Sequence, residues 1–198
     1  MSPTNSGLQL ILASTSRYRK DLLSRLGIAF ETTAPEVDET PLDGEPPAGT
    51  ATRLALAKAQ AVRTRFPRAL IIGSDQVAVC DGVRLDKPIT HAVAVQQLNY
   101  VSDKSVTFHS AVVLLNAESG RIQSRLVPTT VRFRRLGEAE IERYLRREPA
   151  YDCAGSAKAE GLGISLVEAI ESGDPTALIG LPLIALSRML REETLFVP

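Results

Sequence analysis

Acidic and basic side chains that could act on a charged substrate occur at several separate points of the chain. Asp75 is the most informative, because it directly follows the apolar run 71–74, Ile-Ile-Gly-Ser. Packing does not account for a carboxylate there, and α/β sheets commonly place catalytic groups where a strand ends. We therefore predict that a strand ends at Asp75 and that its carboxylate has a functional role.

Two lysines could meet an anion. Lys58 lies four residues after Leu54 and four before Val62, so in a helix it shares their apolar side. A lysine in that position either extends to the edge of the core or meets an anion in a cleft. Lys87, which precedes Pro88, is either an ordinary loop lysine or a second phosphate contact.

The segment 14–19, Ser-Thr-Ser-Arg-Tyr-Arg, has the composition of a phosphate seat. It follows a short apolar run and precedes a helical pattern, so free backbone N–H groups and the positive end of a helix dipole would face the ligand. Its three hydroxyls, with Arg17 and Arg19, add donors and charge. The alternative is a capped surface helix with solvated arginines.

Two further segments have compositions suited to ligand binding. Glu36, Asp38 and Glu39 lie within four residues in a proline-rich stretch, where they could hold Mg²⁺ or Mn²⁺ or form a solvated acidic loop. The segment 153–163 combines three glycines with one lysine and one glutamate, which suggests close approach of backbone to a ligand. Its spacing matches neither a Walker A loop nor GxGxxG.

Several chemistries are excluded by what the sequence lacks. The chain has two histidines and no GxSxG motif, which disfavours a Ser-His-Asp hydrolase and histidine-ligated catalytic zinc. Its two cysteines, Cys80 and Cys153, lie far apart and outside CxxC spacing. We expect neither a disulfide framework nor a structural zinc site, and the low cysteine content is compatible with the cytosol.

Apolar periodicity and turn residues predict alternating strands and helices, and so an α/β fold with a mixed β-sheet and flanking helices. Two lobes around a central cleft are compatible with this pattern, and we treat 1–198 as a single domain. The expected strands are 8–13, 28–33, 70–75, 77–80, 83–85, 106–116 and 121–134. The expected helices are 16–26, 50–66, 90–100, 137–147 and 183–190, and a loop is expected over 35–48.

The charge balance limits the class of partner. Lys plus Arg and Asp plus Glu each total 23 in 198 residues, so the net charge is zero. Polymeric nucleic acid and anionic membranes normally require a basic excess, so we expect neither as a partner. The N-terminus lacks the pattern of a signal peptide, and the nearly apolar run 178–186 is too short to cross a bilayer.

Taken together, the motifs resemble those of the Maf family of nucleoside triphosphate pyrophosphatases over 8–192. Within that family the chain is most similar to the subfamily that acts on 7-methyl-GTP. The motifs are Leu-Ile-Leu-Ala-Ser-Thr-Ser at 10–16, Ala-Pro-Glu-Val-Asp-Glu-Thr-Pro at 34–41, Ile-Ile-Gly-Ser-Asp-Gln at 71–76, Cys-Ala-Gly-Ser at 153–156 with Lys158 and Glu160, and Ile-Gly-Leu-Pro-Leu at 179–183.

The resemblance implies a Maf/ITPase-like fold and a cytoplasmic hydrolase that uses Mg²⁺ or Mn²⁺ to release pyrophosphate from a nucleoside triphosphate. It makes Asp75 the proton acceptor and, with Glu39, a metal ligand. The phosphate-handling positions that it implies are Ser14, Arg19, Lys58 and Lys87. Those that it implies for base recognition are Tyr18, Gln76 and Glu160, with Lys158 as a further substrate contact.

Two alternatives remain open at this point. One is a dTTP or UTP pyrophosphatase of the same family. The other is a nucleotide-binding regulator of cell division, for example an inhibitor of septum formation, in which hydrolysis is incidental. In each case the partner is a small nucleotide, and a homodimer is compatible with the sequence.

Overall fold

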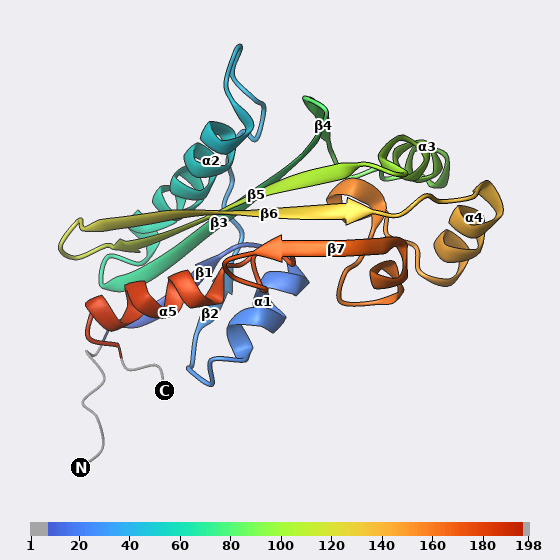
Figure 1. The fold of residues 1–198 in the computed structure, drawn as a ribbon. Helices are drawn as coiled ribbons and strands as arrows, with labels where there is room; N and C mark the ends of the chain where they lie inside the picture. The colour runs from blue at the N-terminus through green and yellow to red at the C-terminus, as the bar shows by residue number, and fades with distance from the viewer. Residues whose placement is uncertain (1–7, 196–198) are drawn as a thin grey trace. The chain divides into compact units, whose positions relative to one another are not determined.

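The strands belong to one mixed sheet with the order β2-β1-β3-β5-β6-β7, and β4 pairs with β3 (Figure 1). The structure is a computed structural model that describes residues 8–195. β1 pairs in parallel with β2 and β3, whereas the β3–β4 and β6–β7 pairs are antiparallel. The strands are β1 (Gln9–Ala13), β2 (Glu31–Thr33), β3 (Ala69–Cys80), β4 (Val83–Leu85), β5 (Ser105–Asn116), β6 (Ile122–Phe133) and β7 (Val167–Ser172).

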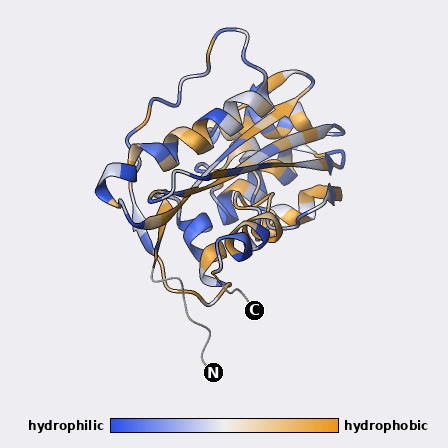
Figure 2. Ribbon diagram, turned by 90° about the vertical axis from the view of Figure 1, so that its left-hand side faces the viewer, coloured by the Kyte–Doolittle hydropathy of each residue, from blue (hydrophilic) through white to orange (hydrophobic). Residues whose placement is uncertain are grey.

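Five α-helices accompany these strands in the described residues, which confirms the predicted mixed α/β class. None of them is long and apolar enough to cross a membrane. In Figure 2 the helices carry hydrophobic and hydrophilic residues side by side, as helices with one packed face do. The helices are α1 (Arg17–Ser24), α2 (Pro47–Ala61), α3 (His91–Val101), α4 (Glu138–Arg147) and α5 (Leu183–Glu192).

The predicted end of a strand at Asp75 is wrong. β3 continues without a break to Cys80, so Asp75 lies inside a twelve-residue strand. The signal that suggested a break was the charged residue Asp75 after the run 71–74. In the structure Ser74, Asp75 and Gln76 each have a hydrogen-bond partner within the fold, so the strand continues through them. β2 is shorter than expected, and β7, most of whose residues are exposed, was not predicted.

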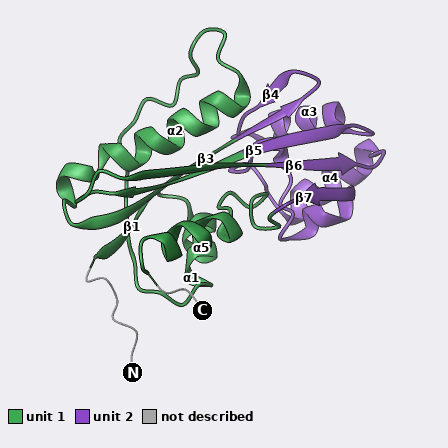
Figure 3. Ribbon diagram, turned by 60° about the vertical axis from the view of Figure 1, so that its left-hand side comes forward, with its two compact units in different colours: residues 1–76, 110–127, 174–198 green, residues 77–109, 128–173 purple. Residues whose placement is uncertain are grey.

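The chain divides into two compact units, drawn in green and purple in Figure 3. Unit 1 comprises 1–76, 110–127 and 174–198, and unit 2 comprises 77–109 and 128–173. β1, β2, α1, α2 and α5 belong to unit 1, whereas β4, β7, α3 and α4 belong to unit 2. Three of the four dividing points fall within β3, β5 and β6, and the fourth lies between β7 and α5.

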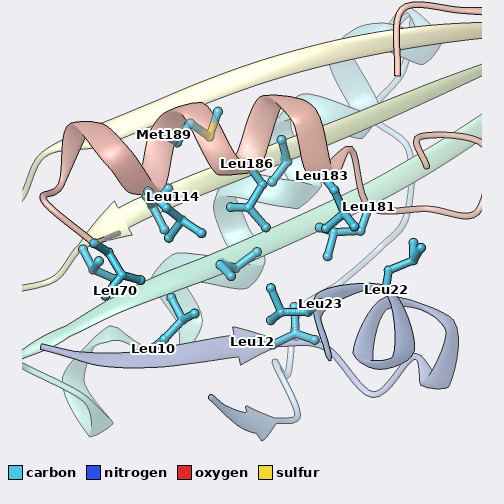
Figure 4. Close-up of a cluster of buried hydrophobic side chains, with 14 residues drawn as sticks. Leu10, Leu12, Leu22, Leu23, Leu70, Leu114, Leu181, Leu183, Leu186 and Met189 are labelled. Atoms are coloured by element: carbon cyan, nitrogen blue, oxygen red, sulfur yellow. The ribbon is translucent and has the colours of Figure 1, made fainter. Parts of the chain in front are cut away.

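In unit 1, α2 covers one face of the strands, and α1 and α5 cover the other (Figures 1 and 3). A cluster of buried leucines and other apolar side chains fills the space between the strands and α1 and α5 (Figure 4). It includes Leu12 from β1, Leu23 from α1, Ile72 from β3 and Leu186 from α5, which are all fully buried.

Successive side chains of a strand point to opposite faces, so β3 serves both sides of unit 1. Leu70 and Ile72 lie in the cluster beneath α1 and α5. Gly73 faces α2, because a Cβ atom built on it would lie 2.0 Å from the backbone oxygen of Ala55. By the same alternation, Asp75 lies on the α2 side and Ser74 on the other.

We predict that Gly73→Ala destabilises the protein severely. The added methyl group would meet the backbone of α2 at Ala55 and Ala59 rather than a side chain that could turn away. Overpacking of this kind costs about 1–3 kcal/mol where side chains can adjust, and a backbone clash should exceed that range. Urea unfolding of the variant measures the loss.

Gly173→Ala is the matched control, since no heavy atom lies within 4 Å of the position that its Cβ would take and its φ is not positive. We expect its unfolding free energy to stay within about 0.5 kcal/mol of wild type. Equal stability of the two variants would show that α2 does not approach β3 this closely.

Candidate active site

A buried ion pair joins α2 to β3. The Nζ atom of Lys58 lies 2.7 Å from Oδ1 of Asp75, and the two side chains are only 6% and 8% exposed. The prediction that Lys58 shares the apolar side of its helix is therefore confirmed, and its ammonium meets an anion rather than extending to solvent. Charged groups this deeply buried require a partner, because leaving either one alone is strongly unfavourable.

The same ammonium has a second acidic partner, Glu39. Oε1 of Glu39 lies 2.8 Å from Nζ of Lys58, although the Glu39 side chain is 59% exposed. Two carboxylates thus converge on one positive charge, one buried and one reached from solvent. Glu36 and Asp38 do not share this arrangement: within residues 8–195 the ion pairs of Lys58 are with Glu39 and Asp75, and Asp38 instead accepts a hydrogen bond from the backbone N–H of Thr40.

The loop that carries Glu39 is tied to α2 by a two-point ion pair. Nε and Nη2 of Arg53 donate to the two carboxylate oxygens of Glu45 at 2.7 and 2.8 Å, and Thr50 donates its hydroxyl to the same group. These hydrogen bonds, chiefly those from Arg53, lower the pKa of Glu45 to about 2. Arg53 also donates to the backbone oxygen of Thr40, next to Glu39.

The predicted phosphate seat at 14–19 is built as a helix start. Ser16 caps α1 by accepting from the backbone N–H of Arg19, and no acidic residue stands in the first turn. The Arg19 guanidinium donates to the backbone oxygen of Gly180 at 2.9 Å and to Oγ of Ser14 at 3.5 Å. Burial lowers the pKa of Arg19, and the charges of Asp75 and Glu39 oppose that effect.

Tyr18 lies on the same helix, and its ring already faces a cation. The guanidinium carbon of Arg17 stands 4.7 Å from the ring centroid, and Arg17 donates a hydrogen bond to the Tyr18 hydroxyl. The aromatic ring expected to contact a base therefore has an arginine over one face.

The amide of Gln76 is held in one orientation. Its Nε2 atom lies within 3.0 Å of the backbone oxygens of Ala177 and Leu178, which can only accept, so this atom is the nitrogen. It also donates to Ser110 Oγ at 2.8 Å, while the Ser110 hydroxyl donates to Ala177. Within residues 8–195 the side-chain hydrogen bonds of Gln76 all use Nε2, so its acceptor Oε1 is available to a ligand.

Ser74 and Ser110 are the contributors that sequence reasoning missed. The Ser74 hydroxyl lies 2.9 Å from the backbone oxygen of Gly180, the same atom that holds Arg19. Both serines are fully buried. A hydroxyl within an apolar strand was the available signal, since buried polar groups must find partners.

The remaining predicted residues belong to unit 2. Lys87 lies in the loop between β4 and α3. Lys158 is mostly buried and pairs with Asp152 at 3.4 Å, and Glu160 is exposed. The backbone of this glycine-rich segment is held by Tyr144, whose hydroxyl accepts from the Lys158 N–H, and by Glu148, which accepts from the Gly163 N–H.

Glu39 and Asp75 are suited to hold a divalent metal ion together with a substrate. Residues 8–195 contain no cluster of three or more His, Cys, Asp or Glu side chains placed for a metal. Mg²⁺, however, is commonly bound through one or two carboxylates plus substrate phosphates. Two carboxylate oxygens that already converge on one cation, Lys58, fit that requirement.

A family model described as Maf-like protein matches residues 9–193. The chain belongs to the Maf family. All of the residues of the candidate site lie inside the matched range, from Ser14 at the helix start to Gly180 in the segment before α5.

Relatives within the Maf family are similar over almost their whole length. A protein named 7-methyl-GTP pyrophosphatase from Burkholderia pseudomallei (strain 1710b) is 58% identical over 186 residues, which cover 92% of this chain and 86% of the relative. One of the same name from Aromatoleum aromaticum is 54% identical over 190 residues, covering 96% and 98%. Another from Cupriavidus metallidurans is 56% identical over 182 residues, covering 92% of each.

We predict that Lys58→Met lowers the free energy of unfolding by about 3–5 kcal/mol, because it leaves the buried Asp75 carboxylate without its counter-charge. Combining it with Asp75→Asn should recover part of the loss. Urea unfolding of the two single variants and the double variant forms the double-mutant cycle that measures this coupling.

Glu39→Gln is the control on the exposed side of the same ammonium. Because solvent screens this pair, the change should cost no more than about 1 kcal/mol. Strictly additive effects of Lys58→Met and Asp75→Asn would contradict a stabilising buried pair.

Proposed function

We propose that this chain is a nucleoside triphosphate pyrophosphatase that hydrolyses 7-methyl-GTP to the monophosphate and pyrophosphate. The observation that carries the proposal is the buried Asp75 carboxylate, oriented by Lys58 and accompanied by Glu39. The printed names of relatives that share more than half of its sequence support the choice of reaction and substrate.

Asp75 acts in this proposal as the general base. A water molecule attacks the α-phosphorus and forms a new P–O bond. The bond between the α-phosphorus and the oxygen that bridges the α- and β-phosphates breaks. The proton of the water passes to the Asp75 carboxylate, and pyrophosphate leaves. Lys58 keeps the carboxylate in place through the 2.7 Å contact, which is the kind of positioning that makes proton transfer effective.

Basic groups stabilise the charge that builds on the leaving group. Arg19 is held by Gly180 and Ser14 beside the first turn of α1, where backbone N–H groups also favour anions. Lys58 and Lys87 supply ammonium groups for the same purpose. Such prearranged charges act most strongly in sites from which water is excluded.

Glu39 and Asp75 would hold a magnesium or manganese ion. When bound, such an ion neutralises charge on the phosphates and makes water more acidic. Two carboxylates offset most of the positive charge of the three basic side chains that we assign to the phosphates, Lys58, Lys87 and Arg19, so the protein alone does not neutralise a triphosphate. A divalent ion supplies the difference.

The groups that we assign to base recognition favour 7-methylguanine. Gln76 offers an acceptor oxygen, Glu160 a carboxylate and Tyr18 an aromatic face, so none of the three presents a hydrogen-bond donor in the role proposed. The guanine edge presents N–H donors, and N7-methylation makes the ring cationic, which adds attraction to an aromatic face. Uracil and thymine present mostly acceptors on that edge.

The partner that we propose is a free nucleotide in the cytoplasm, with Lys158 as a further contact to it.

We treat the whole chain, 1–198, as one catalytic domain despite its two compact units. A dTTP or UTP pyrophosphatase and a nucleotide-binding regulator are the outcomes against which the assay is designed.

The test offers purified protein and Mg²⁺ a panel of 7-methyl-GTP, GTP, dTTP and UTP and measures pyrophosphate release. We expect the highest kcat/KM with 7-methyl-GTP. Asp75→Asn should lower kcat by roughly 10²–10⁴-fold, the usual contribution of a general base, while a non-hydrolysable analogue still binds.

Asp43→Asn, an exposed aspartate in the acidic loop, is the matched control and should turn over like wild type. Faster turnover of dTTP or UTP would replace the substrate assignment. Nucleotide binding without pyrophosphate release would favour the regulator, and an active Asp75→Asn variant would remove Asp75 as base.

A second prediction concerns the orientation of Gln76. Ser110→Ala removes one of the three acceptors that fix its amide, so the ratio of kcat/KM for 7-methyl-GTP over UTP should fall roughly 3- to 10-fold, the equivalent of one hydrogen bond. Competition kinetics with the two nucleotides measure this ratio.

Ser105→Ala is the control, because Ser105 is an exposed residue of the same strand, β5. It should leave the ratio unchanged. A Ser110→Ala variant with wild-type discrimination would show that the fixed amide does not read the base.

A further inference from the structure

The loop of unit 2 that carries Lys87 contains a strained turn. Ile89 has φ +62°, and the N–H of Thr90 donates to the backbone oxygen of Pro88 at 2.6 Å. A hydrogen bond between residues two apart around a positive φ is the rarer, strained form of the γ-turn. A β-branched residue adopts this conformation only when its surroundings impose it.

The Ile89 side chain does not impose the turn, because it is 70% exposed. The constraint must therefore come from contacts on either side of Lys87 and Ile89. At the centre of the turn, the Ile89 N–H donates to the backbone oxygen of Tyr151, and the Tyr151 hydroxyl contacts His91 just after the turn, at the start of α3.

Before the turn, the contact comes from Gln97 on α3. Its Nε2 donates to the backbone oxygen of Asp86 at 2.8 Å, directly before Lys87. Its Oε1 accepts from the hydroxyl of Ser156 at 2.6 Å. The backbone oxygen can only accept, so the orientation of the amide is settled, and Ser156 must be the donor at the other end.

Gln97 thus joins two segments of unit 2 that are far apart in the sequence. One holds Lys87, and the other, 153–163, holds Lys158 and Glu160. Ser156 is fully buried and has φ +58°, next to Gly155 at φ +74°, so this segment is also in an unusual backbone conformation where Gln97 contacts it. α3 packs against both α4 and the short 3₁₀ turn at 154–156.

We propose that Gln97 is a positioning residue that fixes the phosphate-binding Lys87 relative to the base-reading segment with Lys158 and Glu160. This inference rests on the proposed function, which gives those three residues their roles. One side-chain amide holds both segments, so base recognition is coupled to the placement of the ammonium that stabilises the leaving pyrophosphate.

The test compares Gln97→Met, which keeps the length of the side chain and removes both hydrogen bonds, with Gln96→Met. Gln96 is exposed on the same helix, and its side chain makes no hydrogen bond within residues 8–195, so its variant should behave as wild type. For Gln97→Met we expect roughly a 10- to 100-fold fall in kcat with 7-methyl-GTP, the effect of a small misplacement of a catalytic group. The increase in KM should be smaller.

Two more variants separate the arms of the amide. Gln97→Glu can still accept from Ser156 but can no longer donate to Asp86, so it should lose kcat as Gln97→Met does. Ser156→Ala leaves the contact with Asp86 intact and should mainly weaken discrimination between 7-methyl-GTP and GTP.

A second measurement does not depend on activity. Amide hydrogen exchange in the peptide 86–91, followed by mass spectrometry, should be roughly tenfold faster in Gln97→Met than in Gln96→Met, because the strained turn can then relax. A uniform loss of protection throughout the chain would instead indicate general destabilisation and would overturn the proposal.

Wild-type exchange and kinetics in Gln97→Met would overturn the proposal, as would faster exchange with unchanged kcat and discrimination. If the wild-type protein releases pyrophosphate from no nucleotide, the proposed function fails and the positioning role in that reaction fails with it. In that case the exchange comparison still decides whether Gln97 holds the turn.

Discussion

The close approach of α2 to β3 is the constraint on which the candidate site depends. Gly73 leaves no room for even a methyl group beneath Ala55, and this closeness brings Lys58 within 2.7 Å of Asp75 two residues further along the strand. A wider separation between α2 and β3 would leave the buried charges of Lys58 and Asp75 unpaired. The glycine therefore acts as the spacer that makes the ion pair geometrically available, although it has no chemistry of its own.

β3 distributes its polar residues to two different tasks because its side chains alternate. Asp75 faces α2 and the lysine, while Ser74 and Gln76 bond to backbone oxygens of the segment before α5. That segment in turn holds Arg19 through the oxygen of Gly180. Ser74, Asp75 and Gln76, three adjacent residues of one strand, thus supply the buried carboxylate, a contact to the Gly180 oxygen that holds Arg19, and the fixed amide. All three lie within β3 rather than on a loop.

Much of this could be predicted from the sequence. The mixed α/β class, most elements and the apolar side of Lys58 follow from periodicity, and the motif spacing indicated the family. The continuation of β3 beyond Asp75 could not be read, since polar residues inside a buried strand look like its end until their partners are known. The supporting roles of Ser74, Ser110 and Gln97 depend on contacts with residues 11 to 106 positions away, which a linear pattern does not reveal.

The tie between Glu45 and Arg53 has a consequence for how the acidic loop responds to its surroundings. The pKa of Glu45 in the folded protein is about 2, below the usual carboxyl value, so the pair stabilises the attached loop above that usual value and loses its effect only as the pH falls toward about 2. Arginine stays charged throughout. Across the pH range of a living cell, the Glu45–Arg53 pair that holds the segment carrying Glu39 therefore keeps the same charge state.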